Sequence, residues 1–211
     1  MRPDPGGSRE PGSGEAGFEE IYARAGSDFG AIPWAALAPH PALVHWLDGQ
    51  PASDGAAALV VGCGLGDDAE EARRRGYRVT AFDLSPTAVG HCRQRFPQSA
   101  ADYQVADLFA LPGSWDSAFG LVVEIRTLQS LPLPRRGAAV AAIARTIRPG
   151  GRVFVRCLAR DDDEPPGSRP WPLSRRELAA FTEAGLHQAE LLDQPAGPAG
   201  GRSFTAVYTR P

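Results

Sequence analysis

The chain contains no lysine, only three cysteines and no long apolar run. A membrane-spanning helix needs about twenty consecutive apolar residues, so no segment is expected to cross a membrane. Cys63, Cys92 and Cys157 stand far apart and form no C-x-x-C pair. Neither a metal site nor a redox couple is therefore expected, and isolated thiols favour a cytoplasmic location.

Charge of one sign is not concentrated anywhere in the sequence. The net charge is −3 and the pI is about 5.8. A protein that binds nucleic acid needs a basic stripe to neutralise phosphates, so nucleic acid is not an expected partner. Hydrophobic residues make up 43% of the 211 residues, enough to build the core of one domain.

The beginning of the chain differs from the rest in composition. Residues 1–17 are rich in Gly, Pro, Ser and charge, which predicts a disordered tail and lacks the apolar core of a signal peptide. Residues 18–211 are expected to form a single domain. Within it, 18–55 carries two short helical patterns and 160–172 is a polar insertion.

From residue 56 onward, short apolar strands alternate with helical patterns, which predicts βαβ units and a parallel sheet. Two closing strands have no helix between them, so one antiparallel edge strand is expected. The sequence thus predicts an α/β, Rossmann-like, mostly parallel seven-stranded sheet with helices on both faces. The expected strands are 57–61, 78–82, 102–106, 118–124, 152–158, 186–192 and 203–209, and the main helices are 67–75, 85–96, 135–147 and 174–184.

A glycine-rich loop follows the first expected strand. Gly62, Gly64 and Gly66 give the pattern G-x-G-x-G, with Cys63 inside it. Glycines let the backbone turn sharply and let a ligand approach without meeting a Cβ atom. The next helix adds free N–H groups and the positive end of its dipole. Many α/β turns contain glycine, so the loop alone does not identify a ligand.

Asp83 ends the next strand, about twenty residues beyond the glycines. In a nucleoside-binding sheet, a carboxylate at this place binds the ribose hydroxyls. The spacing fits both NAD and S-adenosylmethionine, but Asp67 and Asp68 stand where a pyrophosphate would have to dock. Two carboxylates would repel a pyrophosphate and tolerate an ammonium group. The residues therefore indicate a cationic cofactor that contains a nucleoside, and disfavour an NAD-dependent oxidoreductase.

Two further strand ends carry polar groups. Asp107 follows the third strand, where it either binds an adenine amine or merely starts a turn. Arg126 and Glu124 lie at the end of the fourth strand, where open α/β sheets bind ligands. Arg126 either holds a carboxylate or another anion, or forms a surface ion pair with Glu124 or an aspartate. None of the four histidines stands at a strand end, so no general base is evident and an easily ionised acceptor is favoured.

These motifs resemble the class I S-adenosylmethionine-dependent methyltransferases. The resemblance rests on the glycine loop, Asp83, Asp107-Leu108 and the segment 148–151, Arg-Pro-Gly-Gly, before the fifth strand. A closer resemblance is to the thiopurine S-methyltransferase group and its small bacterial relatives. The residues that carry this resemblance are Cys63-Gly64, Arg126, Leu131-Pro132, Trp171-Pro172 and the aromatic residues Phe18, Tyr22 and Trp34. Two features depart from it: Glu124 replaces the usual Asp, and the acidic run 161–164 has no counterpart.

The resemblance implies S-adenosyl-L-methionine as cofactor and a small-molecule acceptor, with 18–55 as a helical lid and 160–172 on the acceptor side. S-methylation of a thiol is the first hypothesis. N- or O-methylation of an aromatic natural product and a non-catalytic cofactor-binding module are the alternatives, and the oligomeric state stays open. It implies cofactor contacts for Trp34, Gly62, Cys63, Gly64, Gly66, Asp83, Leu84, Asp107, Leu108 and Glu124, a catalytic role for Arg126, and acceptor contacts for Phe18, Tyr22 and Trp171.

Overall fold

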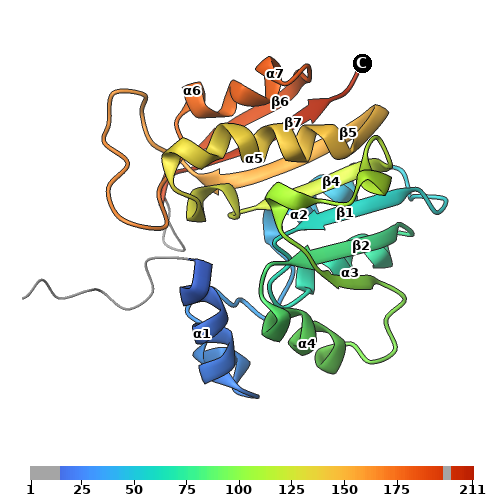
Figure 1. Ribbon diagram of the computed structural model, residues 1–211. Helices are drawn as coiled ribbons and strands as arrows, with labels where there is room; N and C mark the ends of the chain where they lie inside the picture. Colours follow the sequence, from blue (N-terminus) through green and yellow to red (C-terminus); the bar gives the residue numbers. More distant parts are fainter. Residues whose placement is uncertain (1–14, 197–200) are drawn as a thin grey trace, which may run out of the picture.

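A seven-stranded sheet runs through the molecule in the order β3-β2-β1-β4-β5-β7-β6 (Figure 1). This computed structural model describes residues 15–196 and 201–211, so most of the tail predicted for residues 1–17 lies outside the described residues. The strands are β1 Ala57–Val61, β2 Arg78–Asp83, β3 Asp102–Val105, β4 Phe119–Ile125, β5 Ile147–Leu158, β6 His187–Gln194 and β7 Ser203–Thr209.

The pairing of the strands confirms the predicted fold class. The neighbours from β3 to β5 are all parallel, and β1, a wholly apolar strand, lies at the centre of this part. Such strands are buried on both faces, which explains why their sequences show no alternation. Strand β7 follows β6 without an intervening helix and pairs antiparallel with both β5 and β6. The antiparallel pairing is therefore confined to one edge of the sheet.

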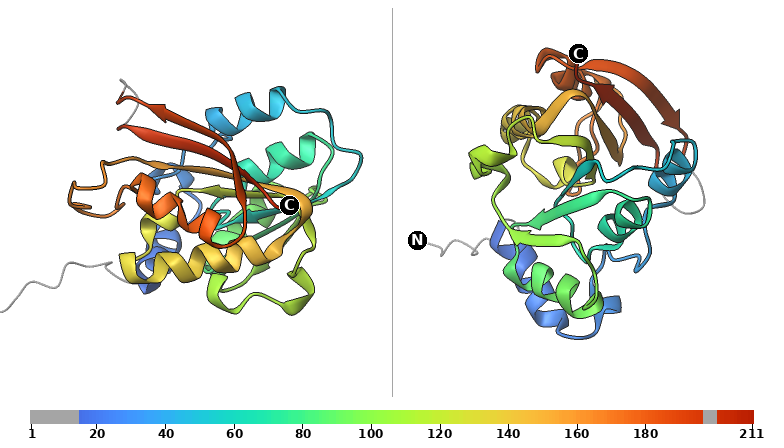
Figure 2. Two further views of the ribbon diagram at one scale, coloured as in Figure 1. Left: turned by 90° about the horizontal axis from the view of Figure 1, so that it is seen from above. Right: turned by 90° about the vertical axis from the view of Figure 1, so that its right-hand side faces the viewer.

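Helices cover both faces of the sheet (Figure 2). One apolar cluster contains residues of α5 and the late helices, and a second contains residues of α2, α3 and α4. Helix α1 lies outside these layers and packs against α4. The helices are α1 Glu15–Ala25, α2 Pro41–Asp48, α3 Asp67–Arg74, α4 Pro86–Arg95, α5 Leu133–Thr146, α6 Arg175–Leu178 and α7 Ala180–Glu183, with 3₁₀ turns η1 Phe29–Ala31, η2 Leu108–Ala110, η3 Gly113–Trp115 and η4 Leu128–Ser130.

Local signals define the helix ends that matter for the site. The Ser85 hydroxyl accepts the Ala88 N–H at 2.9 Å, as expected of an N-cap before Pro86. Gly76 ends the helix before β2 with a φ of +89°, a conformation that side chains disfavour. Both caps lie beside β2 and fix its two ends relative to the flanking helices.

Two predicted elements differ clearly from the structure. Strand β5 begins at Ile147, which pairs with Phe119, rather than at Arg152. The predicted helix 174–184 consists of two short helices that meet at Ala179, whose φ of −61° and ψ of −19° are typical of a 3₁₀ turn. Among the described residues, no helix is long and apolar enough to cross a membrane.

Candidate active site

The carboxyl ends of β1, β2, β3 and β4 lie at one edge of the sheet because these strands are parallel neighbours. The glycine loop leaves β1, and Asp83 is the last residue of β2. Asp107 follows β3 after one residue, and Arg126 follows β4 directly. Four sequence-predicted motifs thus meet where open α/β sheets bind their ligands.

Each glycine of the loop adopts a positive φ: +58° at Gly62, +53° at Gly64 and +88° at Gly66. A Cβ atom at Gly62 would lie 2.4 Å from the Thr127 hydroxyl oxygen, and one at Gly66 would lie 2.8 Å from the Tyr103 hydroxyl oxygen. No other residue fits these positions without displacing a neighbour. The glycines are therefore required by the close packing of Thr127 and Tyr103 against the loop.

Asp83 connects the glycine loop to helix α4. Its Oδ2 atom accepts the Gly64 N–H and its Oδ1 atom accepts the Ser85 N–H, both at 3.0 Å. Burial raises the pKa of this carboxyl, while the bonds to backbone N–H groups oppose the rise. Each oxygen keeps a second lone pair, so a rigidly held carboxylate is available to bind two vicinal hydroxyls.

The residues expected near an adenine ring differ in exposure. Leu84 is 43% exposed beside Asp83, whereas Leu108 is buried. The Asp107 Oδ1 atom accepts the Phe109 N–H at 2.9 Å and so caps η2. The turn-starting role of Asp107 is therefore realised, and its Oδ2 atom is left for a ligand. The exposed face of Leu84 suits a flat apolar ring.

The two aspartates at the start of α3 have different partners. Asp67 forms an ion pair with Arg95, with N–O distances of 2.7 and 2.8 Å. The Asp68 Oδ1 atom accepts the His40 N–H at 2.7 Å, and burial raises the pKa of Asp68 to about 6. Among the described residues, no hydrogen bond reaches the second Asp68 oxygen, and a nearby cationic group would stabilise the charged form of this carboxyl.

Arg126 adopts a φ of +65°, which is rare for a residue with a side chain. Its side chain is exposed and acts electrostatically on Asp68 and His40. Within residues 15–196 and 201–211, the Arg126 guanidinium forms no ion pair, so the alternative of a pair with Glu124 is not realised. A strained backbone with a free cation at a strand end favours ligand binding.

Glu124 does not reach the surface of the site. Its side chain is fully buried, and its Oε1 atom accepts the Leu128 N–H at 2.9 Å. Its Oε2 atom has no hydrogen-bond partner among the described residues, and burial raises the pKa of the carboxyl to about 7. Glu124 thus supports the turn that carries Arg126, and its contact with the cofactor stays a prediction.

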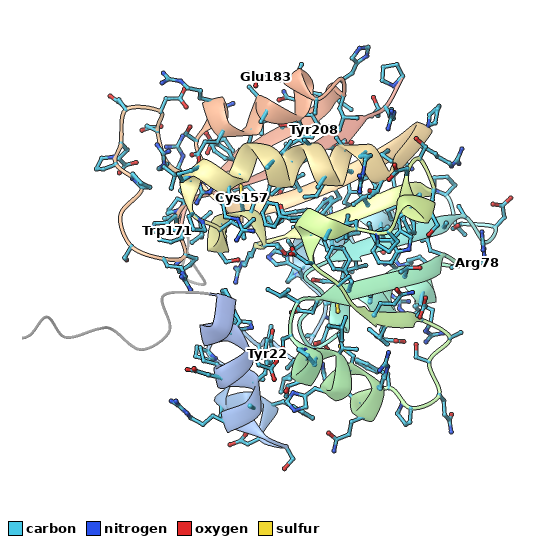
Figure 3. The ribbon with its side chains drawn as sticks, viewed as in Figure 1. Tyr22, Arg78, Cys157, Trp171, Glu183 and Tyr208 are labelled. Carbon is cyan, nitrogen blue, oxygen red and sulfur yellow. The ribbon has the colours of Figure 1, made fainter. Side chains whose placement is uncertain are left out.

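Four aromatic residues and one arginine, from two distant segments, bridge the site. We call these residues the aromatic arch: Phe18, Tyr22, Trp34, Arg169 and Trp171. The Trp34 Nε1 atom donates to the buried Tyr22 hydroxyl at 3.0 Å, and the Phe18 and Trp34 ring centroids are 5.4 Å apart. The Arg169 guanidinium lies 5.4 Å from the Phe18 ring and 5.3 Å from the Trp171 ring. Figure 3 shows Tyr22 on α1 and Trp171 at the insertion.

Sequence reasoning missed the side chains that hold this arch in place. The Glu19 carboxylate accepts hydrogen bonds from the hydroxyls of Ser85 and Thr87 and from the Thr87 N–H, which fixes α1 to the start of α4. The buried Gln129 accepts the Leu158 N–H at its side chain and the Trp171 N–H at its backbone, at 2.7 and 2.8 Å. These contacts join distant segments, so no local pattern predicts them.

The acidic run 161–164 is explained by ion pairs and caps within the insertion. Asp161 pairs with Arg202 at 2.6 Å, and the Asp162 Oδ1 atom accepts the Arg176 N–H at 2.9 Å. Arg160 pairs with Glu177 at 2.6 Å. The run therefore ties residues 160–170 to α6 and β7.

Comparisons with known proteins agree with this geometry. A family model described as "Methyltransferase domain" matches residues 58–151. The ubiquinone biosynthesis O-methyltransferase of Aromatoleum aromaticum is 30% identical over 190 residues, which cover 81% of this chain and 78% of that protein. The corresponding protein of Azoarcus sp. is 33% identical over 124 residues, which cover 58% of this chain and 52% of that protein. The chain thus spans about half the length of several curated relatives that it matches.

Two solved structures share the fold over nearly the whole chain. A structure described as "Conversion of a Disulfide Bond into a Thioacetal Group during Echinomycin Biosynthesis" has a TM-score of 0.73 and 26% identity, and covers 92% of this chain and 91% of its own. The 1,6-didemethyltoxoflavin-N1-methyltransferase of Burkholderia thailandensis, solved with S-adenosylhomocysteine, has a TM-score of 0.72 and 20% identity, with coverages of 99% and 93%. The chain belongs to the class I S-adenosylmethionine-dependent methyltransferases.

Proposed function

We propose that this enzyme transfers the methyl group of S-adenosylmethionine to a small, planar acceptor held under the aromatic arch. The arch carries the proposal, because it joins flat rings from residues 18–55 to Trp171 of 160–172. The Tyr22 hydroxyl lies beside Gly64 after β1, and the Trp171 N–H donates to Gln129 after β4, which supports a position near these strand ends. Residues 18–55 then act as the lid, and the insertion lies on the acceptor side.

The same geometry supports a place for each part of the cofactor. Asp83 would bind the ribose hydroxyls, and the exposed face of Leu84 would cover the adenine near Asp107. Asp68 would face the ammonium group and Arg126 the carboxylate of the methionine end. These assignments match charge with opposite charge and keep the glycine loop under the sulfur.

The cofactor supplies a methyl group that its sulfonium already activates for in-line displacement. The protein then gains most of its rate by aligning the acceptor and excluding water. The aromatic arch serves both purposes, since its rings orient a flat acceptor and cover the strand ends. The buried Tyr22, which lies 3.2 Å from where a Gly64 Cβ atom would be, closes the arch over the loop.

The choice of acceptor atom depends on whether a side chain near the site can accept a proton from the acceptor. Burial raises the pKa of Tyr22 far above its usual range, so the phenol stays protonated. The His40 Nδ1 atom accepts the Ala42 N–H at 3.1 Å, which removes it as a proton acceptor. A thiol ionises near neutral pH and needs little help, so a thiol is the favoured acceptor. The resemblance to thiopurine S-methyltransferases and the neighbour that acts on a disulfide support this choice.

O- or N-methylation is the second candidate, favoured by the O-methyltransferase relatives and the N1-methyltransferase neighbour. A matched series of thiophenol, phenol and aniline, which differ in one atom, separates the candidates. We expect micromolar binding of S-adenosylhomocysteine by calorimetry and fastest methylation of thiophenol. Faster methylation of phenol or aniline would overturn the thiol assignment, and no methylation of any ring would overturn the planar acceptor.

A further inference from the structure

Hydrogen-bond donors gather beyond the methionine end of the site, at the ends of β4 and β5. Ile125 pairs in register with Arg156, and the Arg126 N–H donates to the Arg156 carbonyl at 2.9 Å. Phe154 lies two residues before Arg156 and packs against Trp46 of α2, with ring centroids 5.4 Å apart. Side chains two residues apart share a face, so Arg156 lies on the face that α2 covers.

His40 adds a third donor at the start of α2. Because its Nδ1 atom accepts the Ala42 N–H, the proton of the neutral ring is on Nε2. Burial, together with the charges of Arg126 and Arg156, lowers the pKa of His40 to about 4. Both guanidinium groups therefore lie near a neutral imidazole that presents a donor.

The cluster has more positive than negative charge. Arg156 donates to the Thr205 hydroxyl at 2.8 Å and to the Gln194 side chain, both neutral partners. Asp68 is the carboxylate that acts on Arg126. The ammonium and carboxylate of the methionine end cancel and the sulfonium adds a positive charge, so within the part of the chain that the structure describes at least one positive charge stays uncompensated. A half-buried cation without a counter-charge is costly, and an anion from a second ligand would remove that cost.

We propose that Arg156 and the Nε2–H of His40 bind a carboxylate of the acceptor. The proposal rests on the proposed function, and it narrows the acceptor to an aromatic carboxylate. Two residues beyond Arg156, Leu158 ends β5 and leads into the insertion that carries Arg169 and Trp171. An acceptor whose ring lies under the arch therefore has its carboxylate toward the end of β5.

Calorimetric titration of the protein saturated with S-adenosylhomocysteine tests this site without turnover. The probes are 4-hydroxybenzoate and its neutral isostere 4-hydroxybenzamide. We expect the carboxylate to bind about tenfold more tightly, the effect of one charge-assisted pair. Arg156→Gln should abolish this preference, and Arg156→Lys should keep part of it because the charge remains.

Arg152→Gln is the matched control. Arg152 lies on the same strand and face, where it contacts Gln50 and the Trp46 ring. This variant should keep the preference for the carboxylate. Equal affinity for the two probes, no binding of 4-hydroxybenzoate, or an equal loss in Arg152→Gln would overturn the site.

The anion that Arg156 binds could also be the carboxylate of the cofactor. The probe 5′-methylthioadenosine distinguishes this carboxylate from that of the acceptor, because it lacks the amino acid part of the cofactor. Arg156→Gln should leave the affinities for S-adenosylhomocysteine and 5′-methylthioadenosine unchanged. A loss for the former alone would assign Arg156 to the cofactor and overturn the acceptor site. A protein that binds 4-hydroxybenzoate but methylates no ring would contradict the proposed function and leave the anion site standing.

Discussion

Asp83 accepts two backbone N–H groups and still has lone pairs for a ligand, so its loss should be felt in cofactor binding. We expect Asp83→Ala to weaken S-adenosylhomocysteine binding by about 1–3 kcal/mol, the usual loss for hydrogen bonds to a charged group. Asp83→Asn keeps one acceptor oxygen and should lose less. Calorimetry measures both, with the exposed Asp102→Ala as control; unchanged affinity in Asp83→Ala would remove Asp83 from the ribose site.

Glu124 should make stability depend on pH. Its pKa is about 7 in the folded protein and ordinary when unfolded, so the folded state binds more protons between about pH 4.5 and 7. Stability from this group is therefore present at low pH and lost as the pH rises through 7, by at most roughly 1.4 kcal/mol per pH unit. Urea unfolding at pH 5 and 8 measures the effect.

Glu124→Gln is the matched variant, because it keeps an acceptor for the Leu128 N–H and carries no ionisable group. Relative to the parent protein, it should gain stability from pH 5 to pH 8. An identical pH dependence in the two proteins would show that Glu124 stays ionised in the fold, and would contradict the cause given for its raised pKa.

At the level of elements, the Glu19 carboxylate attaches α1 to α4, because it accepts three hydrogen bonds from the start of α4. We expect Glu19→Ala to let α1 move away from α4 and to speed the release of S-adenosylhomocysteine roughly tenfold. This factor corresponds to the loss of about 1.4 kcal/mol of interaction between α1 and α4. Stopped-flow dissociation measures the rate. Glu20→Ala, the exposed neighbour, should release the ligand as slowly as the parent protein does.

The elements themselves were predictable because each carries a local signal. The apolar run of β1 predicts the central strand, and Ser85, Gly76 and Ser174 mark helix ends by caps. The path from α5 into β5 could not be predicted. A Cβ atom at Gly151 would lie 2.8 Å from atoms of Phe119, Ile147 and Arg148, a close approach that no local pattern encodes.

The residues of the site also fall into those that the sequence predicts and those that it does not. The glycine loop and Asp83 stand at fixed places in a repeating unit, so the sequence predicts where they meet. Glu19 and Gln129 act across distances of 66 and 29 residues, and Arg156 resembles any strand residue until α2 is placed beside it. Groups that act through tertiary contacts have no signature in one sequence.

In the proposed site the cofactor would contact residues at the ends of β1, β2 and β4 and at the starts of α1 and α3, so its binding should stabilise the whole molecule. A ligand at one hundred times its dissociation constant adds about 2.7 kcal/mol to the free energy of unfolding. For a chain of this length, that raises Tm by roughly 5–10 °C. Thermal unfolding with S-adenosylhomocysteine measures the shift, and NAD is the control, because Asp67 and Asp68 oppose a pyrophosphate at the start of α3. A larger shift with NAD would mean that these two carboxylates do not select the ligand, and would transfer the selection to the glycine loop.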